Sequence, residues 1–184
     1  MTGLRPMLSE MRWISLRLMG PLQSWGFDSQ YNRRNTGLMP TKSAIAGICC
    51  AALGYPRGSL EEGNFLKEFS KLKMTAIAIP YEKKGVFLET RRLQDWHTVQ
   101  KTIRANGKTK DCHITHRQYL TDAAFGVLLE GAGAFLERIK PALQDPKWGV
   151  WLGRKTCIPS APVLVGIFKT QKRHFVLLLE KRLW

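Results

Sequence analysis

The chain has 184 residues, 44% of them hydrophobic, which is enough to build one packed domain. Its 29 Lys and Arg against 14 Asp and Glu give a net charge of +15, which favours an anionic partner, with nucleic acid ahead of a membrane surface. No apolar run approaches the roughly 18 residues that span a bilayer, and no signal peptide is visible, so we expect a cytoplasmic protein with no membrane partner.

The first half of the chain predicts one buried strand, a long loop and two helices. We expect a single domain over 11–184 after an N-terminal extension, 1–10. The Gly, Asn, Asp and Ser residues of 22–40 predict a long functional loop. The expected elements are a strand over 13–19, a helix from Thr41 or Ser43 to Leu53 closed by Gly54, a helix over 60–72 and strands over 73–81 and 86–90.

A basic hairpin interrupts the second half. Residues 86–118 are poor in apolar side chains and rich in Lys and Arg, and Asn106-Gly107 is a favourable hairpin tip. Beyond it we expect strands over 119–129, 163–168 and 174–180 and an amphipathic helix over 132–143. Without the hairpin the order is strand, helix, strand, strand, helix, strand. The expected fold is therefore α+β, a ferredoxin-like (RRM-type) βαββαβ domain with a protruding β-hairpin thumb.

Two distant segments resemble halves of one phosphate site. Residues 18–26 with 40–47, and residues 151–160, each join regular structure to a loop rich in Gly, Pro, hydroxyls and cations. Such loops offer backbone N–H groups and positive charge to a phosphate chain. Plain helix capping at Thr41 and Ser43, and a simple turn at 153–155, remain alternatives.

The hairpin suits RNA. Its cations fit backbone phosphates, and Trp96, His97 and Tyr119 near its stem could stack on unpaired bases. A solvated surface loop is the alternative. We interpret four further tryptophans as anchors of the core or of an interface: Trp13, Trp25, Trp148 and Trp151.

Catalytic and metal chemistry receive little support. The four cysteines form no C-x-x-C pair, so we expect reduced thiols, no metal and no cofactor. A metal-independent ribonuclease is an alternative, with His116 as general acid or base, Lys110 or Arg117 steadying the phosphate and Tyr119 nearby.

Several motifs in the same order resemble one family. Gly20 to Gly26, Pro40 to Ala44 and Gly153 to Cys157 resemble the CRISPR-associated Cas-five family of the RAMP superfamily, and Leu93 to Gln100 with Arg117 to Ala123 look like its type I-E branch. The similarity covers roughly residues 12–165.

The resemblance implies a non-catalytic subunit of Cascade, a ribonucleoprotein of antiviral defence, that caps the 5′ handle of crRNA. The implied partners are that handle, the Cas-seven backbone subunit, the large subunit and, through the complex, target DNA. The type I-C relative instead cuts precursor RNA. The RNA-binding set that we expect is Gln23, Ser24, Trp25, Arg33, Arg34, Thr36, Lys42, Ser43, Arg91, Arg92, His97, Arg104, Arg117, Tyr119, Arg154 and Lys155.

Overall fold

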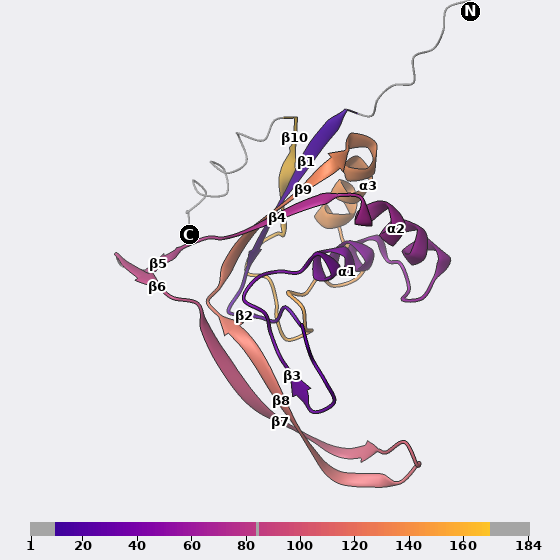
Figure 1. Ribbon diagram of the computed structural model, residues 1–184, viewed down its shortest axis with the longest axis vertical. Coiled ribbons are helices and arrows are strands. Elements are labelled where there is room, and N and C mark those ends of the chain that lie inside the picture. Colours follow the sequence, from indigo (N-terminus) through magenta and orange to yellow (C-terminus); the bar gives the residue numbers. More distant parts are fainter. Residues whose placement is uncertain (1–9, 84, 170–184) are drawn as a thin grey trace, which may run out of the picture.

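A four-stranded antiparallel sheet forms the body of the protein (Figure 1). The computed structural model describes residues 10–83 and 85–169, so the predicted strand 174–180 and Trp184 lie outside the described residues. The strand order is β10-β1-β9-β4, and every neighbouring pair is antiparallel. The strands are β1 (Met11–Met19), β4 (Lys73–Ala78), β9 (Ala124–Ala132) and β10 (Leu164–Phe168). The predicted α+β class is confirmed.

Three helices lie on one side of this sheet in Figure 1: α1 (Lys42–Leu53), α2 (Leu60–Ser70) and α3 (Gly133–Gln144). The N-cap of α1 is Thr41, whose hydroxyl accepts a hydrogen bond from the backbone N–H of Ala44 at 3.3 Å. Gly54 ends the helix with a φ of 72°. Ser59 caps α2 in the same way. Helix α2 ends two residues before its predicted end, because Lys71 and Leu72 already lead into β4.

The core lies between the sheet and the helices. Ile14, Leu16 and Leu18 alternate along β1 and are fully buried. In α3, Leu136 and Ile139 are also fully buried. Each such side chain contributes about 1.5–3 kcal/mol relative to an exposed one. The predicted amphipathic face of α3 is therefore confirmed.

The cysteines give a prediction. Cys49 and Cys50 face the core from α1, and Cys157 is buried as well. Cys112, in the basic hairpin, is exposed. Burial raises the pKa of the Cys49 and Cys157 thiols and raises that of Cys50 to about 11. We expect a thiol-specific disulfide reagent at pH 8 to label Cys112 quickly and the other three only after unfolding. Rapid labelling of two or more thiols in the folded protein would contradict this.

The raised thiol pKa values also predict a loss of stability in alkali. Unfolding exposes these thiols, which then ionise near their ordinary value of 9.0. Stabilisation by the protonated, buried thiols is thus fully present below about pH 9 and is lost as the pH rises through the higher folded pKa values.

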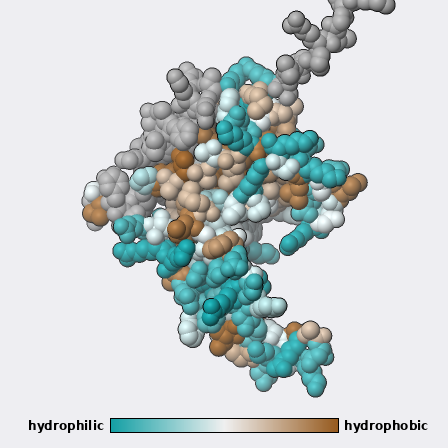
Figure 2. All heavy atoms as spheres, viewed as in Figure 1, coloured by the Kyte–Doolittle hydropathy of each residue, from teal (hydrophilic) through white to brown (hydrophobic). Residues whose placement is uncertain are grey.

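A long hairpin, the thumb, projects from the body (Figure 1). It consists of β7 (Arg91–Ile103) and β8 (Thr109–Thr121), paired along almost their whole length. Gly107 turns its tip with a φ of 77°, as predicted for Asn106-Gly107. Figure 2 shows hydrophilic residues over much of the thumb.

The boundaries of the thumb differ from those predicted. Residues 86–88 (β6) pair with 81–83 (β5) in a separate small hairpin, so the thumb begins at 91 rather than 86. At the other end of the thumb, β8 runs to Thr121. Asp122, with a φ of 51°, then separates β8 from β9. Tyr119 therefore belongs to the thumb and not to a core strand over 119–129.

The predicted loop over 22–40 contains two short strands. Leu22–Gln23 (β2) pairs antiparallel to β8, and Arg33–Arg34 (β3) pairs parallel to it. Both lie on the edge of β8 opposite β7. The base of the thumb is consequently a small sheet that holds this loop in place.

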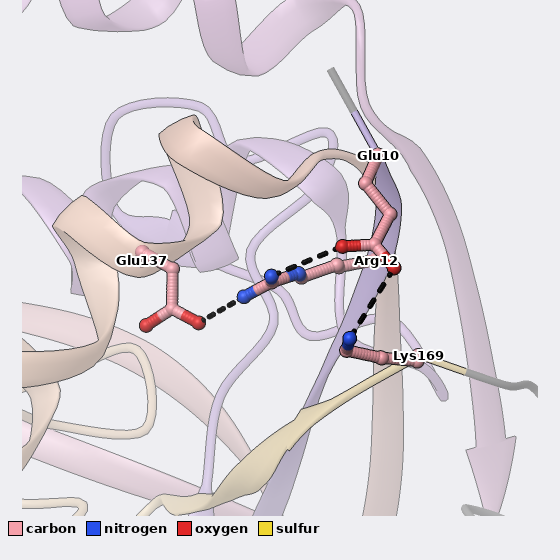
Figure 3. A network of polar contacts seen from close by, with 4 residues as sticks. All are labelled: Glu10, Arg12, Glu137 and Lys169. Atoms are coloured by element: carbon pink, nitrogen blue, oxygen red, sulfur yellow. Dashed lines mark hydrogen bonds and ion pairs between the residues drawn. The ribbon is translucent and has the colours of Figure 1, made fainter. Parts of the chain in front are cut away.

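Polar contacts tie the first strand to α3 and to the chain after β10 (Figure 3). Arg12 donates to Glu137 at 2.6 Å and to Glu10 at 3.1 Å, and Lys169 lies 3.5 Å from Glu10. The hydrogen bond from Arg12 and the charge of Lys169 hold the pKa of Glu10 below its ordinary value. These exposed pairs fix local geometry more than they add stability.

Candidate nucleic-acid interface

The two distant segments with phosphate-site composition meet in the fold, as the sequence predicts. The backbone N–H of Ser24 donates to the carbonyl of Leu152 at 3.0 Å, and that of Ser160 donates to Met19 at 2.8 Å. Gly153 permits this approach: a Cβ there would collide with the carbonyl oxygen of Ser24, and its φ is 102°. The loop after α3 is thereby fastened to the end of β1 and to β2.

A hollow of about 740 Å³ opens beside these contacts. Thr41 and Ser43 at the start of α1 line it together with Lys155, so the partial positive charge of a helix N-terminus and one cation face it. Trp148 and Trp151 supply aromatic lining. The arrangement suits a phosphate next to an apolar or aromatic group.

Three residues predicted to contact RNA are fully buried instead: Gln23, Trp25 and Thr36. Gln23 donates to the carbonyls of Leu18 and Ala123 at 3.1 and 2.5 Å. The hydroxyl of Thr36 accepts from the N–H of Trp25 at 2.8 Å. The prediction of RNA contact by these side chains is wrong, because they expose no surface. They shape the loop, and Trp25 is a core anchor, packed edge-on against Phe125.

Ser24 is almost fully buried, and its hydroxyl lies 3.3 Å from the carbonyl of Gln118. Ser24 also lines the hollow. Because its hydroxyl already donates to Gln118, Ser24 shapes the wall of the hollow rather than donating to a ligand.

Arg154 is held by backbone carbonyls. Its guanidinium donates to Gln118 at 3.1 Å and to Arg34 at 2.7 Å, and lies 4.7 Å from the centre of the Tyr119 ring. Arg154 therefore joins the loop after α3 to β3 and β8. The sequence predicts that it binds phosphate, but backbone carbonyls occupy its guanidinium. Lys155, in contrast, is exposed and lines the hollow.

Lys42 is another expected phosphate ligand, but its ammonium group donates to the carbonyls of Ser70 and Leu72 at 2.6 and 2.5 Å. It links the start of α1 to the end of α2. We predict that Lys42→Met lowers the free energy of unfolding by about 2 kcal/mol, because two charge-assisted hydrogen bonds are lost. Urea denaturation measures this.

The salt dependence of RNA binding separates the two roles of Lys42. A structural lysine leaves the slope of log K against log salt unchanged on substitution, whereas a phosphate contact to a single strand would reduce it by about 0.7. A reduced slope for Lys42→Met would contradict our assignment.

Exposed arginines surround the base of the thumb. Arg33 and Arg34 form β3, and Arg91 and Arg92 begin β7 on the other side of β8. Arg104 lies near the tip. All five are exposed, and none of them forms an ion pair with a carboxylate among the described residues. Free fork donors of this kind are suited to phosphate oxygens.

Two other predicted residues have partners within the thumb. His97 lies 3.7 Å from Asp95, and the Nε of Arg117 donates to the hydroxyl of Thr115 at 3.2 Å. Both remain open to solvent in part.

The alternative ribonuclease site is not assembled. His116 and Tyr119 are three positions apart on β8, so their side chains leave opposite faces. His116 contacts Trp96 at 5.0 Å between ring centres. Tyr119 is buried beneath Arg154, so the prediction that its ring contacts RNA is wrong as well. The ammonium group of Lys110 lies 3.2 Å from His113. The three residues thus have separate partners. Among the described residues, no group of three His, Cys, Asp or Glu is placed to hold a metal.

Comparison with known proteins agrees with the family resemblance of the sequence motifs. The model of the family described as CRISPR-associated protein (Cas_Cas5) matches residues 13–180. The chain is 29% identical over 159 residues to the CRISPR system Cascade subunit CasD of Escherichia coli (strain K12), covering 84% of this chain and 70% of that one. Within the described residues, no helix has the length and apolar character to cross a membrane.

Two solved structures resemble the fold. A chain of a "CRISPR RNA-guided surveillance complex" is 32% identical with a TM-score of 0.68, and covers 83% of this chain. A "Crystal structure of Cas protein" is 34% identical with a TM-score of 0.54, and covers 82%. The present chain spans 61% of the length of each of these chains. The match over 13–180 shows that the chain belongs to the CRISPR-associated Cas-five family.

Proposed function

We propose that this protein is a non-catalytic subunit of a Cascade complex that binds and caps the 5′ handle of crRNA. The observation that carries the proposal is the set of exposed arginines around the base of the thumb, which have no carboxylate partner among the described residues and lie close to the loop that borders the hollow. Similarity to CasD and to a chain of an RNA-guided surveillance complex supports the Cascade role.

The handle would follow two surfaces. Arg33 and Arg34 on β3 would bind its phosphates, and Arg91 and Arg92 would bind them on the other side of β8. A terminal nucleotide would enter the hollow, where Ser43 and Lys155 offer donors. The rest of the thumb would meet the Cas-seven backbone subunit, and the body would meet the large subunit.

A ferredoxin-like body fits this role. The order β10-β1-β9-β4 supports the βαββαβ plan with one additional helix, α2, and with the thumb inserted in the sequence between β4 and β9. RNA-binding modules of the RRM type share that plan.

Incubation of the purified chain with labelled repeat RNA in EDTA tests the proposal, with native and denaturing gels run in parallel. We expect a shifted complex, intact RNA and weaker binding of a scrambled sequence. A discrete cut would identify a processing ribonuclease instead, and equal binding of scrambled RNA would indicate a generic RNA-binding protein. Co-purification with the other Cascade subunits tests the assignment to the complex.

A further inference from the structure

One face of the thumb base brings together six side chains, five from the strands β3, β7 and β8 and one from the residue that follows β3. The register pairs Arg33 of β3 with His116 of β8, and pairs His116 with Trp96 of β7. Gln118, two residues after His116 on β8, pairs with Gln94 of β7. Asn35 lies two residues after Arg33. Residues two apart on a strand share a face. We call this face the thumb platform: Arg33, Asn35, Gln94, Trp96, His116 and Gln118.

A small hollow of about 240 Å³ lies on the platform. Five of the six residues line it, namely Arg33, Asn35, Gln94, His116 and Gln118. Three of them are amides, an unusual share of uncharged polar groups in a chain with a net charge of +15.

Trp96 stands next to this hollow with 67% of its surface exposed. Its ring meets His116 edge to face, at 5.0 Å and an interplanar angle of 71°. The contact orients the indole and leaves much of it open to solvent. An exposed, oriented indole next to polar groups is a stacking surface for a base.

The chemistry of the hollow selects a base over a phosphate. A phosphate offers only acceptors, whereas each amide of Gln94 and Gln118 offers both a donor and an acceptor. All four bases present a donor and an acceptor side by side. Adenine and cytosine do so with an exocyclic amine beside a ring nitrogen, and Gln and Asn commonly pair with adenine in this way, so we commit to these two bases. Arg33 remains available for the phosphate of the same nucleotide.

We propose that the thumb platform binds one unpaired adenine or cytosine, stacked on Trp96 and hydrogen-bonded by Gln94 and Gln118. This rests on the proposed function, because the nucleotide would belong to the RNA that the thumb base grips. It adds a base preference at one position, which phosphate contacts cannot supply.

Single-base changes along the RNA test the platform. In each variant one adenine is replaced by inosine, or one cytosine by uracil, which exchanges the amine for a carbonyl. We expect one position at which the change weakens binding to the full chain about 5- to 10-fold, the value of one or two hydrogen bonds. Gln94→Met should remove this discrimination and leave the salt slope unchanged, because no charge is lost. Gln94 is exposed, so the variant should fold.

Two further variants complete the design. Gln100→Met is the matched control: Gln100 is exposed on the same strand and face, but lies outside the hollow, so discrimination should persist. Trp96→Ala should weaken binding about 5-fold or more whichever base occupies the position, through loss of stacking.

The outcomes separate the platform from the proposed function. If wild-type protein binds the RNA but no position depends on an amine, or if Gln94→Met keeps the discrimination, the platform is overturned and the proposed function stands. If the wild-type chain binds none of the RNAs, both are overturned.

Discussion

The double variant Arg33→Ala, Arg34→Ala is expected to bind handle RNA on the order of 10- to 100-fold more weakly than the wild type. Both guanidinium groups are exposed and have no carboxylate partner among the described residues, so they are free to contact phosphates. Two lost contacts to a single strand should also lower the slope of log K against log salt by about 1.4. Titration of labelled RNA at several salt concentrations measures both quantities.

The matched control removes the same charge from another surface. Lys67 and Lys71 are exposed at the end of α2, away from the thumb. Alanine at both positions should leave the slope almost unchanged, because neither would contact the handle. The carbonyl of Arg34, which accepts from Arg154, persists in the double arginine variant, so the thumb base should remain intact. Equal effects of the two double variants would show that net charge alone drives binding.

The elements that could be predicted from the sequence are those that local chemistry defines. A threonine hydroxyl at Thr41 and a glycine at Gly54 mark the ends of α1, and the structure places both caps there. Aromatic, aliphatic and β-branched residues over 13–19 define β1, and Asn106-Gly107 defines the tip of the thumb. Each signal lies within a few residues of the feature that it specifies.

The base of the thumb could not be predicted in the same way. The strands β2 and β3 are two residues long and exist only because β8 offers them an edge from a distant part of the chain. The end of β8 depends on the left-handed conformation of Asp122, which a non-glycine residue adopts under tertiary constraint.

The roles of the cations depend on partners that the sequence does not reveal. Lys42 and Arg154 resemble phosphate ligands by residue type and by the loops around them. In the fold their donors are taken by backbone carbonyls from α2, β3 and β8 and from the residues that follow α2. Lys155 and Arg34, in contrast, are exposed and form no ion pair with a carboxylate in the part of the chain that the structure describes.

The platform amides Gln94 and Gln118 are absent from the RNA-binding set expected from the sequence. Alternation along the predicted hairpin is the signal that could have placed each of them on one face with its cross-strand partner. The hollow between them depends also on Arg33 and Asn35, which reach the platform only through the pairing of β3 with β8.

Gly153 tests whether the loop after α3 holds the site together. We expect Gly153→Ala to lower the free energy of unfolding by about 3 kcal/mol or more. The methyl group would collide with the backbone carbonyl of Ser24, which is part of the hydrogen-bonded junction between the two segments, and a φ of 102° is unfavourable for alanine. Urea denaturation followed by tryptophan fluorescence measures the change.

A second glycine supplies the control with the opposite sign. Gly63 lies inside α2, where no neighbouring atom comes within 4 Å of the position that a methyl group would take, so Gly63→Ala should raise stability by about 1 kcal/mol through helix propensity. RNA binding should be unchanged in Gly63→Ala. In Gly153→Ala it should weaken even where the protein is fully folded, because Lys155 and the wall of the hollow move with the loop. A folded Gly153→Ala protein with wild-type affinity would show that the hollow takes no part in holding the RNA.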